Sequence, residues 1–342
     1  MPLTINDIAR LGKCSKATVS AVLNEKPGIS RATRERILDI VKKYNYKPSQ
    51  LARSLYTQKT RTIGLVIKEI DNPFFAKLMR GVYQVCAEHD YTVLLGSSEL
   101  SVEHQRESID ALKSQQVEGI IISPLYGDDV NQQLLFDIQT DRCPVVLLND
   151  IGLKEMACVG IDNRKAAREA VAYLIANGHT RIGCLAGPEH SINAAERVKG
   201  YKEALDAAGL PREADFIKRA GSTIEDGYRT GKAVFQKHQP FSAVLCYNDM
   251  IAVGFCNALH ELGKRIPQDV SVIGFDNIEF CSAMRVPLTS IDVPAYEIGK
   301  TAAAELFKLL NDPVGKKRQT LIETYLVERE SVKKKKGENI DD

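Results

Sequence analysis

The sequence predicts a multidomain protein with a small all-α head and an α/β body of two doubly wound parallel-sheet lobes. Residues 1–61 hold thirteen Lys and Arg against four Asp and Glu, a balance of +9, whereas the whole chain is only +2. Apolar residues in this basic head recur at helical spacing. From residue 62 onward, β-branched runs alternate with helical stretches, which is typical of parallel sheets covered on both faces.

The head is predicted to form three short helices. Thr4, Ser15 and Ser30 can cap them, and the segment 12–14 breaks the first from the second. Leu11 ends the expected apolar stripe of the first helix, and the third helix should turn inward Ile37, Ile40, Val41 and Tyr44. A small core with a basic exterior is typical of a helix-turn-helix unit, although a three-helix bundle with solvated charges has the same pattern.

The segment 49–56 follows Pro48 and is predicted to be a helix of about two turns, which alone in water is marginal. Leu51, Ala52 and Leu55 give it one apolar face. The alternative is an ordinary interdomain linker whose Leu55 packs on the body.

The body contains seven apolar runs typical of buried strands, and helical stretches separate them. The runs are 63–67, 93–96, 119–122, 145–148, 182–185, 244–246 and 270–274, and the helices include 75–89, 103–115, 164–177, 194–208 and 249–262. A body of this length favours two lobes over one oversized sheet. Ligands of such folds bind beyond the carboxyl ends of the strands, here between the lobes.

Motifs that would indicate an enzyme or a bound cofactor are missing from the sequence. No G-x-G-x-x-G, G-x-S-x-G or H-E-x-x-H occurs, and the segment 227–233 is one residue short of a P-loop and lacks its Ser or Thr. The eight cysteines are scattered, so we expect free buried thiols and no metal site. Without a signal peptide or a long apolar run, we expect a cytoplasmic protein with no cofactor and no membrane contact.

Several motifs, in order, resemble the lactose/galactose repressor (LacI/GalR) family. They are the segments 4–11 and 15–24 in the head, 46–55 in the hinge, and 71–75, 160–163, 177–179, 248–250, 274–277 and 287–289 in the body. The resemblance spans residues 3 to about 332. It implies a helix-turn-helix head, a hinge helix and two lobes of periplasmic-binding-protein type.

The resemblance also implies how DNA is read. Lys16, Ala17 and Ala21 fall at base-reading positions, but an alanine can contact only a thymine methyl, so base preference does not transfer from the family. Leu55 matches a leucine that wedges into the central base step of the minor groove. The other candidate DNA-binding residues, mostly phosphate contacts, are Thr4, Ser15, Thr18, Ser20, Asn24, Ser30, Thr33, Leu51, Ala52 and Arg53.

The implied effector site lies at strand ends of both lobes. Its candidates are Asp71, Phe74, Phe75, Asn149, Asn193, Arg197, Asn248 and Asp276. Asn248 and Asp276 could instead cap turns, and Phe75 could be core. Three departures from the common sugar-binding set, Asn149, Ser222 and Val293, leave the sugar unnamed, and a phosphorylated sugar or a purine stays open.

Together these features predict a DNA-binding transcriptional regulator, usually a repressor in this family, controlled by a small molecule that is expected to be a sugar. The expected partners are a pseudo-palindromic operator and a second copy of the chain in a homodimer. The alternatives are a cytoplasmic solute-binding protein and a sugar-processing enzyme on the same fold. The sequence leaves open whether the ligand releases DNA or promotes its binding.

The domain boundaries expected from the sequence divide each lobe between two segments of chain. They are 1–47 for the helix-turn-helix, 48–60 for the hinge, 61–162 with 292–322 for the first lobe, 163–291 with 323–332 for the second, and 333–342 for a disordered tail.

We predict that Leu55→Ala weakens operator binding and leaves ligand affinity unchanged, because the wedge is lost while the lobes are untouched. A mobility-shift titration measures the first effect and calorimetry the second. Unaltered DNA affinity would contradict the wedge assignment.

Overall fold

The computed structural model describes residues 3–23, 26–46, 59–125, 135, 138, 143–149, 155–189, 191–236, 241–312 and 318–334. The chain forms two compact units, Met1–Arg61 and Thr62–Asp342. Several predicted features lie outside the described residues. They are Asn24, the hinge residues Leu51, Ala52, Arg53 and Leu55, and the end of the tail.

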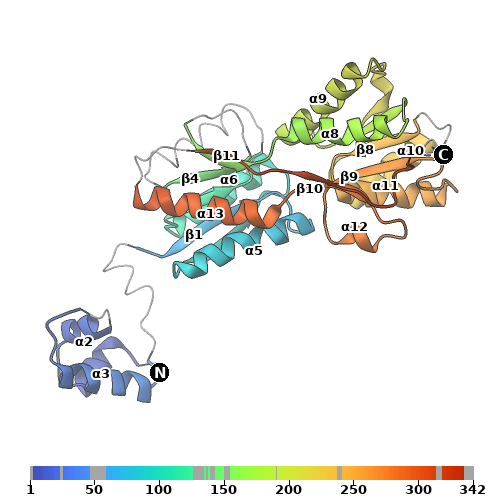
Figure 1. Cartoon of the computed structure of the whole chain (residues 1–342). Helices are drawn as coiled ribbons and strands as arrows, with labels where there is room; N and C mark the ends of the chain where they lie inside the picture. Colours follow the sequence, from blue (N-terminus) through green and yellow to red (C-terminus); the bar gives the residue numbers. More distant parts are fainter. Residues whose placement is uncertain are drawn as a thin grey trace, which may run out of the picture. The chain divides into compact units, whose positions relative to one another are not determined.

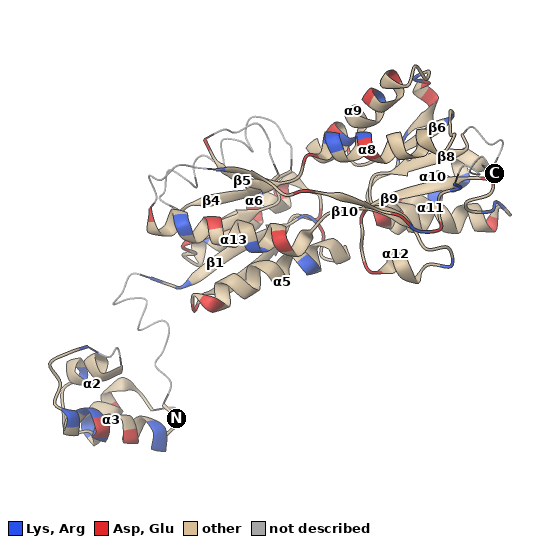
Figure 2. Cartoon of the chain, in the orientation of Figure 1, with Lys and Arg blue, Asp and Glu red and all other residues tan. Residues whose placement is uncertain are grey.

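The first unit contains the three predicted helices, α1 (Ile5–Leu11), α2 (Lys16–Leu23) and α3 (Arg31–Lys43). Hydroxyl groups cap each of them, since Thr4, Ser15 and Ser30 accept hydrogen bonds from backbone N–H groups three residues ahead. The buried core is small and consists of Ile8, Ala9, Val19, Val22 and Ile37. Basic side chains gather along α3 (Figure 2).

Two residues of the head do not face this core as predicted. Leu11 is 43% exposed and Tyr44 is 44% exposed. Leu11 is the last residue of α1 and Tyr44 follows the last turn of α3. At helix ends the chain leaves the helical path, so the 3.6-residue periodicity no longer decides which side a residue faces.

The second unit is built on two six-stranded sheets, which confirms the predicted two-lobed α/β fold (Figure 1). All strand pairs of the first sheet are parallel. Its strands, in spatial order, are β11 (Gln319–Leu321), β5 (Ala157–Gly160), β4 (Val145–Leu148), β3 (Gly119–Ile122), β1 (Thr62–Ile67) and β2 (Thr92–Ser97). The helices of this lobe whose bounds the structure describes are α5 (Pro73–Glu88), α6 (Val102–Ser114) and α13 (Ala295–Asn311).

The second sheet is parallel except for β12, which pairs antiparallel with β10. In spatial order it contains β12 (Tyr325–Val327), β10 (Thr289–Asp292), β9 (Ser271–Asp276), β8 (Ala243–Cys246), β6 (Ile182–Ala186) and β7 (Ile217–Arg219). Its helical segments are α8 (Asn163–Ala176), α9 (Ile192–Ala207), η1 (Ala214–Phe216), α10 (Ile224–Phe235), α11 (Asp249–Glu261) and α12 (Phe280–Ala283).

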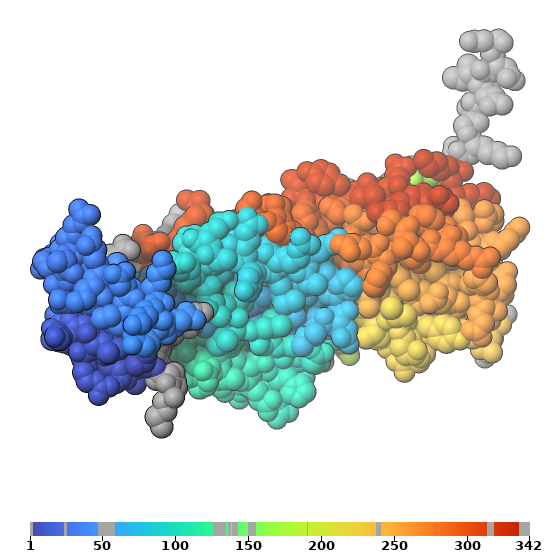
Figure 3. Space-filling model, turned by 90° about the horizontal axis from the view of Figure 1, so that it is seen from below, coloured from blue at the N-terminus to red at the C-terminus, as the bar shows by residue number. Residues whose placement is uncertain are grey.

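The chain passes between the lobes after β5, after β10 and between β11 and β12. The orange and red surface of the C-terminal residues accordingly extends along both lobes in Figure 3. The sequence predicts that Asp292 begins the return into the first lobe, but it is the last residue of β10 and pairs with Asp276 in the second sheet.

Several elements were absent from the sequence prediction, and each has a physical reason. The strands β11 and β12 are three residues long and carry exposed side chains, so they show no apolar run. The segment similar to a P-loop is part of the helix α10, and its glycines serve helix packing.

All eight cysteines are free, and six of them are buried. Among the described residues, no helix has both the length and the apolar character needed to cross a membrane.

The helices α10 and α11 approach each other at glycines. A Cβ placed on Gly254 would lie 1.8 Å from the carbonyl oxygen of Ile224, and one on Gly227 would lie 2.2 Å from that of Ile251. Both contacts involve backbone atoms, which cannot turn away as a side chain could. The two glycines therefore set the distance between the helices that cover one face of the second sheet.

We predict that Gly254→Ala lowers the free energy of unfolding by about 1–3 kcal/mol through overpacking. At an exposed helical position a change from Gly to Ala would stabilise the protein by up to about 1 kcal/mol. The sign of the change in unfolding free energy therefore tells close packing from simple helix propensity. Chemical denaturation measures it. The exposed Asn257→Ala on the same helix is the matched control, and equal effects of the two substitutions would contradict the close-packing account.

Candidate functional site

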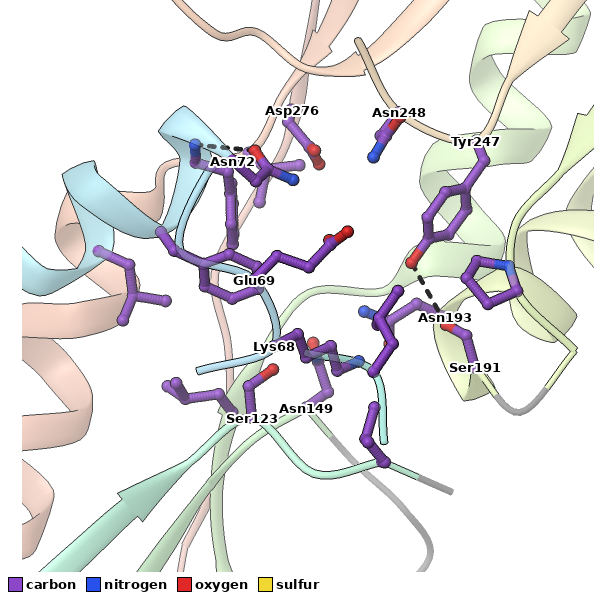
Figure 4. Close-up of a pocket in the computed structure, with 18 of the residues that line it drawn as sticks. Lys68, Glu69, Asn72, Ser123, Asn149, Ser191, Asn193, Tyr247, Asn248 and Asp276 are labelled. Carbon is purple, nitrogen blue, oxygen red and sulfur yellow. Dashed lines mark hydrogen bonds between the residues drawn. The ribbon is translucent and has the colours of Figure 1, made fainter. Parts of the chain in front are cut away.

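A pocket lies between the two sheets, lined by residues that follow strand ends in both lobes (Figure 4). It holds about 990 Å³ of empty space, part of which is continuous with solvent, so it is large enough for a small-molecule ligand. Seven of the eight effector candidates line it, namely Phe74, Phe75, Asn149, Asn193, Arg197, Asn248 and Asp276. Asp71 does not, because its side chain is exposed on the loop before α5.

Six further polar residues of the lining were missed by the sequence analysis. They are Lys68, Glu69, Asn72, Ser123, Ser191 and Tyr247. Lys68, Ser123 and Tyr247 each follow directly on a strand, β1, β3 or β8. The rule that ligands bind at the carboxyl ends of parallel strands could have found them.

Arg197 is the central charged group of the pocket. It lies on α9, is buried, and its Nε donates to Asn163 Oδ1 over 2.9 Å. One terminal nitrogen donates to the carbonyl oxygen of Tyr247, and the other lies 3.7 Å from Asp276. The guanidinium also lies over the Phe275 ring, 3.5 Å from its centroid. These contacts tie α8, α9, and the ends of β8 and β9 together.

Asp276 ends β9 with a side chain that is 9% exposed. Burial raises the pKa of its carboxyl well above the ordinary value, and Arg197 opposes that shift. The backbone of Asp276 has φ of 106°, and that of Asn149 at the end of β4 has φ of 112°. Such conformations are strained for residues other than glycine and cluster at ligand sites. The strain occurs at one strand end in each lobe, and both strand ends line the pocket.

Asn248 caps a helix, which is the alternative role that the sequence allows for it. Its Oδ1 accepts from Ile251 N over 2.8 Å and caps α11, while its Nδ2 donates to the Ser222 carbonyl oxygen over 3.0 Å. Both polar atoms of its amide are therefore used by the protein itself. Asn248 lines the pocket, but its contacts are those of a helix cap.

The two phenylalanines at the start of α5 differ in exposure. Phe75 is 6% exposed and belongs to the large hydrophobic core, as the alternative for it proposed. Phe74 is partly buried and packs against the cores of both lobes. The rings meet edge to face with centroids 5.2 Å apart. Phe74 is therefore the better placed of the two to form an apolar wall for a ligand.

A hydrogen bond links the two lobes at the pocket. Ser222, just before α10 in the second lobe, donates from Oγ to Glu69 Oε1 over 2.5 Å. Figure 4 shows the Glu69 carboxylate reaching toward the side of the pocket that carries Tyr247. Burial raises the pKa of Glu69, and the Ser222 hydrogen bond partly offsets that shift. The serine at position 222, noted as a departure from the family pattern, thus contacts the opposite lobe.

Lys68 is buried at the end of β1, with 7% of the residue exposed. Burial and, to a lesser extent, the positive charge of Arg197 lower the pKa of its ammonium to about 8, while Glu69 acts in the opposite direction. Figure 4 shows Lys68 near Ser123, Asn149 and Asn193.

The predicted DNA-binding residues of the head that the structure describes lie on α2 or at helix caps. Lys16 and Ala17 are exposed in the first turn of α2, and Ala21 is half-buried one turn later. Ser20 is also half-buried on α2. Thr4 caps α1, and the hydroxyl pairs Ser15–Thr18 and Ser30–Thr33 are each joined by a hydrogen bond of 2.9 Å.

Comparison with known proteins gives two family matches. A model described as "Periplasmic binding proteins and sugar binding domain of LacI family" matches residues 60–330, and one described as "Bacterial regulatory proteins, lacI family" matches residues 4–49.

Individual proteins are similar over nearly the whole chain. The HTH-type transcriptional repressor PurR of Aliivibrio salmonicida (strain LFI1238) is 32% identical, covering 97% of this chain and 99% of that protein. The HTH-type transcriptional repressor CytR of Escherichia coli (strain K12) is 34% identical over 87% of each. A solved lac repressor dimer, bound to operator and the anti-inducer ONPF, is 25% identical with a TM-score of 0.86, covering 97% of this chain and 99% of that one.

We predict that Lys68→Met stabilises the unliganded protein, by up to about 3 kcal/mol, in a pH-dependent way. Between pH 8 and 10.5 the unfolded chain binds the Lys68 proton and the folded chain does not, so wild-type stability rises with pH over that window. The gain from the substitution should be full below about pH 8 and vanish near pH 10.5.

Denaturation of both proteins across this range measures the difference. The exposed Lys300→Met should show no such gap. A pH-independent difference for Lys68→Met would mean that packing, and not the buried charge, is responsible.

Proposed function

Because the chain belongs to the LacI family of bacterial regulatory proteins, we propose that its interlobe pocket binds a sugar that controls its affinity for operator DNA. Membership of this family makes the chain a ligand-controlled, DNA-binding transcriptional regulator and not an enzyme. The observation that carries the proposal is the convergence of polar side chains from both lobes on one pocket with an apolar wall.

The chemistry of the lining supports a polyhydroxylated ligand. Each hydroxyl of a sugar must find a hydrogen-bond partner when it is buried, since an unpaired one is costly. The pocket offers neutral amides and hydroxyls from Asn72, Ser123, Asn149, Asn193 and Tyr247, and carboxylates from Glu69 and Asp276. Phe74 supplies an apolar face for the carbon-bound hydrogens of the ring.

For DNA, we propose that α2 enters the major groove with Lys16 as its main donor to bases. Ala17 and Ala21 can contact only thymine methyl groups, so sequence preference would depend on few direct contacts. The surplus of positive charge in residues 1–61 supports a strong, salt-dependent grip on phosphates. We further propose a homodimer on a pseudo-palindromic operator, as the solved lac repressor dimer binds its operator.

The link between ligand and DNA would run through the angle between the lobes. The Glu69–Ser222 hydrogen bond spans the pocket, so a ligand that binds there competes with it or reinforces it. A change of angle would move the two hinge segments of a dimer together or apart. We also propose a cytoplasmic location, in keeping with a DNA-binding repressor. For the lobes we propose the boundaries predicted from the sequence, with Asp292 assigned to the second lobe.

We predict that Asp276→Asn abolishes the response to ligand while the protein stays folded. A carboxylate accepts several hydrogen bonds from sugar hydroxyls and an amide fewer, and a hydrogen bond to a charged group contributes about 1.5–3 kcal/mol. Ligand affinity should therefore fall tenfold or more. The change from Asp to Asn is nearly isosteric, unlike removal of Arg197, whose guanidinium also joins four structural elements.

The measurement is an operator titration by fluorescence anisotropy, with and without the ligand found in a thermal-shift screen of sugars, sugar acids, sugar phosphates and purines. The exposed Asp215→Asn serves as the control, because it lies away from the pocket with its side chain 98% exposed. If the ligand changes the operator affinity of Asp276→Asn as it does that of the wild type, the proposed site is wrong.

A further inference from the structure

Lys68 is the one charged group of the pocket lining that makes no hydrogen bond or ion pair within the described part of the chain. The charges of Arg197 and Glu69 act on the pKa of its ammonium, but no carboxylate of the described residues lies within ion-pair distance of it. Glu69 is its neighbour in sequence, yet that carboxylate is hydrogen-bonded to Ser222 of the opposite lobe.

The other cation of the lining is already engaged by the protein. All three nitrogens of the Arg197 guanidinium have partners, in Asn163, Tyr247 and Asp276. Asp276 therefore balances the charge of Arg197, so the guanidinium offers no uncompensated positive charge to a ligand's anion. Lys68 alone among the described lining residues offers a free positive charge.

The Lys68 side chain is buried and its ammonium has no protein partner, yet Nζ is not among the fully enclosed polar atoms of the described residues, so it keeps contact with the space of the pocket. A charge that has lost part of its hydration without gaining a partner is costly. An acceptor with a negative charge removes that cost, and a charge-assisted hydrogen bond is stronger than a neutral one. We propose that the effector is a sugar acid, a polyhydroxylated molecule whose single carboxylate binds the Lys68 ammonium. This inference rests on the proposed function of the pocket and adds the chemical class of its ligand.

The arrangement of the pocket gives the ligand a direction. Lys68 lies beside the neutral side chains of Ser123, Asn149 and Asn193, while Asp276 and Asn248 are at the other side (Figure 4). A carboxylate at the Lys68 side avoids repulsion by Asp276, and the hydroxyls of the same molecule can donate to Asp276 and Glu69. A phosphate dianion would carry one charge more than the single free cation can balance.

The test compares acids with matched neutral molecules by calorimetry on the full-length protein. The panel contains the aldonates and uronates of five- and six-carbon sugars, the parent sugars and alditols, and the corresponding sugar phosphates. We expect at least one acid to bind, and its neutral counterpart to bind on the order of 100-fold more weakly.

Two variants assign that preference to Lys68. Lys68→Met and Lys68→Gln should each lower the affinity for the acid by a similar factor and change the affinity for the neutral sugar far less. The exposed Lys300→Met should retain the wild-type preference, which excludes an effect of net charge. Melting temperatures check that each variant is folded, and two different replacements guard against failure of one.

The outcomes separate this inference from the proposed function. Tighter binding of a neutral sugar or a sugar phosphate than of every acid overturns the sugar acid but leaves the regulator intact if that ligand alters operator affinity. Binding of no member of the panel counts against both. An acid that binds both Lys68 variants as it binds wild type contradicts the role of Lys68.

Discussion

The buried guanidinium of Arg197 is the interaction on which the ligand pocket depends. It leaves α9 and reaches the first residue of α8, the carbonyl oxygen after β8 and the carboxylate at the end of β9. A buried charge is tolerated only when it is paired, and here each nitrogen of the guanidinium has a partner. The same contacts that satisfy Arg197 hold Asp276 at the pocket wall, with its backbone at φ of 106°. Stability of the second lobe and geometry of the ligand site therefore share one set of bonds.

With Arg197 engaged, the remaining charges decide what the pocket can recognise. Glu69 belongs to the first lobe, but its hydrogen-bond partner Ser222 belongs to the second. Lys68 beside it has no such partner among the described residues. One side of the pocket thus presents acceptors for hydroxyl groups and the other a free cation. This asymmetry would orient a ligand as well as bind it, because the two kinds of group attract different parts of a sugar acid.

The head separates the tasks of binding and reading DNA. Its core consists of five buried side chains, and the surplus of charge lies on its exterior. Charge of this kind binds phosphates without regard to sequence. The exposed start of α2 carries Lys16 and Ala17, so direct readout depends on few groups. Deformability of the DNA at the operator centre would then supply part of the specificity.

The sequence by itself determined the helix-turn-helix head, the alternation of strands and helices and the two-lobed fold, because hydrophobic periodicity and helix caps are local signals. It also named seven residues of the pocket, through polar groups at strand ends and through motifs that resemble the family. Only the tertiary structure decided that Asp71 is exposed, that Asn248 caps a helix, and that Ser222 contacts Glu69. Glu69 and Ser222 lie far apart in the sequence, and whether Lys68 has a partner depends on which side chains of both lobes fold against it. Such facts arise from packing between distant segments, for which local patterns carry no signal.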